Sequence, residues 1–83
     1  MATVRLRLFA AARAAAGCGS DTLDASTLGD ALDRARATYG PQFTAILERS
    51  RVWVNGDEAP DGDETVLVDD DEIAVLPPVS GGR

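Results

Sequence analysis

The residues that could take part in a reaction gather at the C-terminal end of the sequence, in the segment 77–83, Pro-Pro-Val-Ser-Gly-Gly-Arg. Two adjacent prolines favour an extended backbone, because each fixes its own φ near −65°. Gly81 and Gly82 have no Cβ, so this part of the chain is thin enough to thread a narrow channel and approach a nucleotide. A terminal carboxylate, with an unperturbed pKa of about 3.5, is ionised at neutral pH and could attack an activated phosphate.

The rest of the sequence supplies few groups for catalysis. It contains no histidine, so no imidazole is available as a general base or as a zinc ligand. The single cysteine, Cys18, lies between two glycines in a turn context, and we interpret it as an incidental or structural thiol. We therefore expect no metal site and no cofactor bound by this chain. Chemistry at the diglycine would depend on catalytic groups and ATP supplied by partner proteins.

The charge balance excludes some classes of partner. The chain has 14 acidic and 8 basic side chains, a net charge of −6 and no lysine, which argues against nucleic-acid binding. An acidic balance of this kind favours a partner with a basic surface. No run of residues approaches the length of an apolar membrane span, and the N-terminus lacks the apolar core of a signal peptide. We expect a cytoplasmic protein that does not enter the membrane.

The first third of the sequence predicts a strand, a short helix and a second strand. Residues 3–9 alternate between apolar and mostly charged side chains, which is the pattern of a strand with one buried face. The alanine-rich segment 10–16 predicts a short helical turn that ends at Gly17. After the loop that follows, Thr22 and Leu23 could pair back as a short second strand.

The main helix is predicted over residues 28–39. Its apolar side chains recur at helical spacing, and they are Leu28, Ala31, Leu32, Ala35 and Tyr39. Thr27 is the expected N-cap, with the Asp30 carboxylate reaching back to the start of the helix. Gly40 and Pro41 end the helix, and a second short helical segment could follow, carrying Phe43, Ile46 and Leu47.

The second half predicts two longer strands and a short one. Residues 51–54 are β-branched and aromatic, Asn55-Gly56 is a strong hairpin signal, and a short return strand is expected at 58–59. The last strand covers 73–76, where the prolines end strand pairing. A right-handed crossover would place the first and last strands side by side and parallel. The prediction is an α+β roll of the ubiquitin-like β-grasp type: a mixed sheet of four or five strands with one main helix on one face.

This reading divides the chain into a β-grasp domain, 1–76, and a flexible C-terminal diglycine tail, 77–83. On that body, three sequence motifs resemble the MoaD branch of the MoaD/ThiS sulfur-carrier family. Residues 4–17, VRLRLFAAARAAAG, are similar to the family's opening segment, and Val54-Asn55-Gly56 resembles its central turn. Residues 71–82, DEIAVLPPVSGG, match the family's C-terminal motif almost residue for residue. The resemblance covers nearly the whole chain.

The resemblance implies the small subunit of molybdopterin synthase. A MoeB-like enzyme, using ATP and Mg²⁺, would adenylate the carboxylate of Gly82, and a sulfur donor protein would convert it to a thiocarboxylate. A MoaE-like large subunit would then receive the tail and pass the sulfur to cyclic pyranopterin monophosphate, in a heterotetramer. The chain alone would not be catalytic. The tail residues expected to enter the partner's active site, besides Gly82, are Pro77, Pro78, Val79, Ser80 and Gly81.

The resemblance also points to a docking surface near the tail. Phe9 and Leu76 match positions of the family's partner-binding surface; alternatively, Phe9 covers the alanine-rich turn and Leu76 ends the core. Arg13 matches the family's arginine in the opening segment, but we favour a solvated surface arginine over a binding role for it.

Two residues depart from the family pattern. Asp70 stands where the family usually has a glycine, and we expect it to keep the turn, because Asp tolerates a positive φ better than most residues. Arg83 follows the second glycine and would have to be removed before Gly82 could be activated.

Three other functions fit the same residues. The chain could carry sulfur for thiamine or cysteine biosynthesis, with the same chemistry at the tail and a different acceptor. It could be a ubiquitin-like modifier that forms isopeptide bonds through Gly82. It could also be a binding domain whose tail has no role, because glycine-rich chain ends are common.

Overall fold

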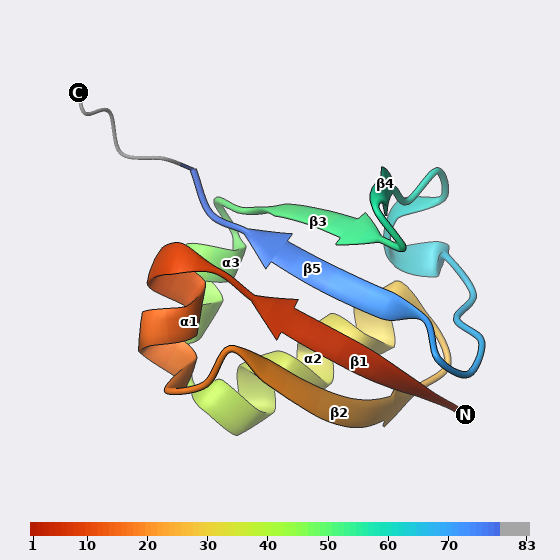
Figure 1. The fold of residues 1–83 in the computed structure, drawn as a ribbon, viewed down its shortest axis with the longest axis horizontal. Coiled ribbons are helices and arrows are strands. Elements are labelled where there is room, and N and C mark those ends of the chain that lie inside the picture. The colour runs from red at the N-terminus through yellow and green to blue at the C-terminus, as the bar shows by residue number, and fades with distance from the viewer. Residues whose placement is uncertain (79–83) are drawn as a thin grey trace.

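The computed structural model of the protein describes residues 1–78, in which a five-stranded sheet carries helices on one face (Figure 1). β1 (Ala2–Leu8), an interior strand of the sheet, buries every second side chain, as its alternating sequence predicts. Val4, Leu6 and Leu8 are almost fully buried against the helices, while Arg5 and Arg7 point to the other face. We call that second face, which no helix covers, the open face of the sheet.

The order of the strands is β2-β1-β5-β3-β4. β2 (Ser20–Ala25) runs antiparallel to β1, and β5 (Glu72–Leu76) runs parallel to it on the other side. β3 (Arg51–Val54) pairs antiparallel with β5 and with the two-residue strand β4 (Asp57–Glu58). The predicted parallel pairing of the first and last strands is therefore confirmed, as are the mixed sheet and the β-grasp fold.

Three α-helices cover one face of the sheet. α1 (Ala10–Ala16) ends at Gly17 in a left-handed conformation, α2 (Leu28–Tyr39) is the main helix, and α3 (Pro41–Leu47) begins at a proline. The Thr27 hydroxyl accepts a hydrogen bond from the Asp30 N–H at 3.2 Å, which confirms the predicted cap. The Asp30 carboxylate, however, accepts from the N–H of Ser26 at 3.1 Å, one residue earlier than a standard capping box would place it.

Some predicted boundaries were wrong. β1 ends at Leu8, because Ala10 turns the chain with a φ of 50° and leaves Phe9 as the N-cap of α1. β2 has six residues, although the sequence suggested only Thr22 and Leu23, because its polar side chains hide the alternation. The return strand is one residue earlier than predicted, since a two-residue turn at Asn55-Gly56 must pair Val54 with residue 57.

The core lies between the sheet and the helices. Its largest fully buried side chain is Phe43 of α3, which packs against the Tyr39 ring at a centroid distance of 5.1 Å. In residues 1–78 no polar or charged side chain is buried. None of the helices in this part of the chain has both the length and the apolar character needed to cross a membrane.

The turn before β5 is held by side-chain hydrogen bonds. Asp71 accepts from the N–H of Val68 and from the Asn55 side chain, and Asn55 accepts from the N–H of Glu72. Asp70 adopts a φ of 72°, which confirms the prediction that this residue keeps the turn by tolerating a positive φ. β5 thus enters the sheet in a fixed register.

Candidate functional site

The end of β5 is where the predicted tail leaves the sheet. The last pair of β3 and β5 joins Leu76 to Arg51, and Pro77 and Pro78 follow outside the ladder. Neither proline can donate a backbone hydrogen bond, so the sheet ends at the position that the sequence predicts. The remaining tail residues, Val79, Ser80, Gly81, Gly82 and Arg83, lie outside the residues that the structure describes. The division into a domain 1–76 and a tail 77–83 stays a prediction.

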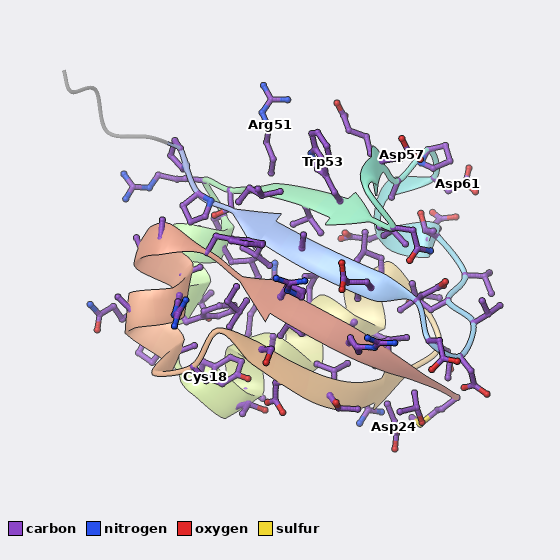
Figure 2. The ribbon with its side chains drawn as sticks, viewed as in Figure 1. Cys18, Asp24, Arg51, Trp53, Asp57 and Asp61 are labelled. Carbon is purple, nitrogen blue, oxygen red and sulfur yellow. The ribbon has the colours of Figure 1, made fainter. Side chains whose placement is uncertain are left out.

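Two shallow hollows flank the prolines. The first, of about 360 Å³, lies beside β3 and is lined by Arg49, Arg51, Trp53, Leu76, Pro77 and Pro78. The second, of about 310 Å³, lies toward the helices and is lined by Ala11, Ile46, Arg49, Pro77 and Pro78. Figure 2 shows Arg51 and Trp53 projecting from β3, with Arg51 nearer to the end of β5. We call Pro77 and Pro78 the tail root. It lies between the Trp53 side chain, the arginines Arg49 and Arg51, and the helix pair α1 and α3.

Trp53 gives the first hollow an unusual property. Its indole Nε1 is buried and has no hydrogen-bond partner among the described residues. An unpaired buried donor costs free energy, because water is excluded and no acceptor replaces it. A partner that brings a carbonyl or carboxylate oxygen to this side chain would recover that cost.

The two residues predicted to form a docking surface lie at the same end of the sheet. Leu8 pairs with Val75, so the residues that follow them in the chain, Phe9 and Leu76, lie beyond that pair. Phe9 is 38% exposed, and the guanidinium carbon of Arg7 lies 5.6 Å from the centre of its ring. Leu76 is half-buried. Their arrangement is compatible with a docking surface, and their binding role stays a prediction.

Sequence reasoning missed Trp53, Arg49 and Arg51 as neighbours of the tail. One signal was present: Trp53 stands between Val52 and Val54, which pack against the core, so it must point to the open face. Arg49 lies in the connection between α3 and β3, and its position beside the prolines follows only from the folded arrangement.

The other candidate groups lie elsewhere. Cys18 is half-buried, and its thiol donates to the Tyr39 hydroxyl at 3.5 Å, while that hydroxyl donates to the Asp21 carboxylate. Burial, followed by these hydrogen bonds with Asp21 and Cys18, raises the pKa of the Tyr39 phenol. Figure 2 places Cys18 near α1, far from Arg51 at the tail root. Within residues 1–78 no group of three or more acidic, histidine or cysteine side chains could hold a metal ion.

A family model described as the ThiS family matches residues 6–82, which is nearly the whole chain and includes the diglycine. The chain belongs to the ThiS family. This family comprises ubiquitin-like sulfur carriers, and the MoaD-type resemblance seen in the sequence falls within it. For this ThiS-family chain, Arg83 is the one C-terminal residue beyond the match.

Solved structures share this fold over nearly the whole chain. Small archaeal modifier protein 1 from Methanosarcina acetivorans is 33% identical, with a TM-score of 0.88, and the alignment covers 99% of this chain and 98% of that one. The modifier protein of the same name from Haloferax volcanii is 28% identical, with a TM-score of 0.84 and coverages of 96% and 99%.

A third structure contains a complex. It is the complex of subunits 1 and 2 of the molybdopterin-converting factor from Helicobacter pylori. The matching chain of that complex is 28% identical to this chain, with a TM-score of 0.67 and coverages of 96% of this chain and 99% of that one. The comparison with curated protein sequences gives no match.

Proposed function

We propose that this chain is the sulfur carrier of molybdopterin synthase, its non-catalytic small subunit, and that Gly82 bears the sulfur as a thiocarboxylate. The observation that carries the proposal is the family match, which runs through the diglycine to Gly82. The structure supports it locally, because β5 ends at Leu76 and two prolines follow outside the sheet. The similarity to the molybdopterin-converting factor of H. pylori favours this acceptor among those that the family offers.

The proposed chemistry needs a free carboxylate on Gly82, so Arg83 has to be removed first. The Gly82 carboxylate then attacks the α-phosphate of ATP, held with Mg²⁺ by a MoeB-like enzyme, and pyrophosphate leaves. Sulfur at the oxidation level of sulfide, supplied by a sulfur donor protein, attacks the acyl carbon of the adenylate, and AMP leaves, so that a thiocarboxylate remains. In the complex with a MoaE-like subunit, this sulfur passes to cyclic pyranopterin monophosphate. The catalytic groups belong to the partners, which agrees with a chain that has no histidine.

The body of the chain would position the tail. Pro77 and Pro78 would direct the chain away from the sheet. Gly81 has no Cβ, so it would keep the chain narrow next to Gly82. Phe9, Leu76 and the hollow at Trp53 form the surface that would meet the partner. The Trp53 Nε1–H, which has no acceptor among the described residues, would donate a hydrogen bond to an oxygen of the partner in the complex.

The molybdopterin assignment is tested by complementation. A bacterial strain that lacks the small subunit of its molybdopterin synthase is given three variants: the chain ending at Gly82, the full chain, and the Gly82 chain carrying Gly82→Ala. We expect the first to restore molybdenum-enzyme activity by more than ten-fold over the third. Restoration by the full chain would show that the host removes Arg83. No restoration by the chain ending at Gly82, although it is folded and thiocarboxylated, would reject this pathway.

A ubiquitin-like modifier is the second candidate. The observation that favours it is the similarity to small archaeal modifier protein 1, which has the highest identity of the three structures compared above. It predicts peptides in which a lysine side chain of another protein is joined to Gly82, detectable by mass spectrometry. Sulfur carriage for thiamine or cysteine biosynthesis keeps the thiocarboxylate, and complementation of strains that require those compounds would separate it.

A further inference from the structure

A positively charged hollow lies on the open face of the sheet, apart from the tail root. It has a volume of about 490 Å³ and is lined by Arg5, Arg7, Arg13, Gly19, Ser20 and Glu72. Three arginines and one glutamate are among its lining residues, in a chain whose net charge is −6. The prolines, Leu76 and Trp53 line other hollows, and none of them contributes to this one.

The arginines of the hollow are only partly neutralised. Arg7 lies 3.6 Å from Glu72, but both side chains are about half exposed, so this pair holds the guanidinium weakly. Among the described residues, neither Arg5 nor Arg13 forms an ion pair. By contrast, Arg34 and Arg36 of α2 are paired with Asp30 and Asp33 on their own helix. The hollow thus retains positive charge that a ligand can use.

Gly19 helps to place the third guanidinium. A Cβ built on Gly19 would lie 3.2 Å from both the Nε and the Cζ of Arg13, so the side chain rests close against the backbone of this residue. Arg13 belongs to α1, whereas Arg5 and Arg7 belong to β1. The close approach of Arg13 to Gly19 therefore places a guanidinium of α1 in the same hollow as Arg5 and Arg7 of β1.

The spacing of Arg5 and Arg7 fits an extended peptide. Arg5 and Arg7 alternate along β1, about 6.6 Å apart, which is also the repeat of side chains on one face of an extended segment. The exposed ring of Phe9 stands two residues after Arg7, and the Arg7 guanidinium carbon lies 5.6 Å from its centre. A segment with carboxylates at alternate positions followed by an apolar residue would match Arg5, Arg7 and Phe9, and Arg13 lines the same hollow for a further carboxylate.

We propose that this hollow binds an extended acidic segment of a protein partner, with its carboxylates on Arg5, Arg7 and Arg13 and an apolar side chain on Phe9. Charge complementarity favours this occupant over a nucleic acid, because the net charge of −6 repels a long polyanion while a short segment meets only the hollow. The inference does not depend on the chemistry of Gly82, since the hollow is built from residues 5–72.

The test is a nuclear magnetic resonance titration of the full ¹⁵N-labelled chain with a synthetic peptide that has glutamates at alternate positions and a leucine after them. We expect saturable shifts at the amides of residues 5–9 and 17–20. Arg7→Ser and Arg13→Ser should each weaken binding roughly three- to five-fold, as loss of an exposed charge pair does. Gly19→Ala keeps every charge but displaces Arg13, and it should weaken binding as well.

Arg34→Ser is the matched control, because it removes the same charge from α2 and should leave the affinity unchanged. The proposal is overturned if the peptide gives no saturable shifts, if Arg34→Ser weakens binding as much as Arg7→Ser, or if a peptide with glutamines in place of glutamates binds equally well. Tighter binding of inorganic phosphate or of a single-stranded RNA at the same amides would also overturn it, since either would assign the hollow to another ligand.

Discussion

The two faces of the sheet use the same strands for different purposes. On the covered face, Val4, Leu6 and Leu8 of β1 belong to the core cluster and are closed to water. On the open face, the residues between them are arginines, and the exposed Phe9 follows at the end of the strand. One alternating segment thus supplies both the core and a charged surface, because successive side chains of a strand point to opposite faces.

This difference separates stability from recognition. The covered face holds the fold through apolar burial, which for a chain of this size leaves a net stability of only a few kcal/mol. The open face contributes little to that burial, and its free guanidiniums and half-exposed rings gain more from a partner than from the chain itself. Variants on the two faces should therefore fail in different assays.

The two phenylalanines of the chain give the largest expected contrast. Phe43 is fully buried on the covered side, and Phe9 is 38% exposed on the other. We expect Phe43→Ala to lower the free energy of unfolding by about 3–5 kcal/mol, and Phe9→Ala by less than about 1 kcal/mol. Urea denaturation followed by circular dichroism measures both.

Phe43→Leu is the companion variant, because it should remain folded if Phe43→Ala does not. Equal destabilisation by Phe9→Ala and Phe43→Ala would contradict the division of roles between the faces. Loss of partner binding by Phe9→Ala with an unchanged unfolding transition would support a role of the open face in recognition.

A smaller effect is expected at the helix that covers the sheet. Thr27→Ala removes the side-chain cap of α2 and should cost about 1 kcal/mol of unfolding free energy. Thr38→Ala is a control on the same helix, since the Thr38 hydroxyl only bonds back to the Arg34 carbonyl. An equal loss in both variants would show that the cap is not what holds the helix start.

The smallest effect is confined to alkaline pH. The pKa of Tyr39 is raised in the folded chain, so the folded state keeps its proton at pH values where the unfolded state loses it. The unfolded state then binds fewer protons, and the stability present below the unfolded pKa of about 10 declines as pH rises above it. Tyr39→Phe should remove this part of the decline.

The chain suits that measurement because Tyr39 is its only tyrosine and it contains no lysine. Ultraviolet absorbance reports the tyrosinate directly. Its appearance with a midpoint near the ordinary value of about 10 in the folded protein would contradict the assigned hydrogen bonds.

Most of the fold could be predicted because its signals are local. The alternation in β1, the apolar stripe of α2 and the Asn55-Gly56 turn each depend on neighbouring residues, and the right-handed crossover then fixes the parallel pair. β2 was underestimated because only Leu23 and Ala25 of its residues are apolar. The predicted ends of elements were wrong where a single backbone angle sets the boundary, as the φ of Ala10 does at the end of β1.

The site was predictable only in part, because only some of its signals are local in the sequence. Pro77 and Pro78 mark the end of the sheet in the sequence itself. Arg49 and Trp53 reach the prolines through the pairing of β3 with β5, and Arg13 reaches Arg5 and Arg7 through the turn at Gly19. These residues come from segments that are distant in the sequence, so no spacing along the chain predicts that they lie together.

The central claim is that Gly82 carries sulfur. Its most direct test is the intact mass of the chain ending at Gly82 after incubation with ATP, Mg²⁺, a MoeB-like enzyme and a sulfur donor. If Gly82 carries sulfur, the mass rises by the exchange of one oxygen for one sulfur, and this gain lies in the C-terminal peptide and is absent when ATP is omitted. A chain that is activated by none of the family's adenylating enzymes and never gains this mass would contradict it.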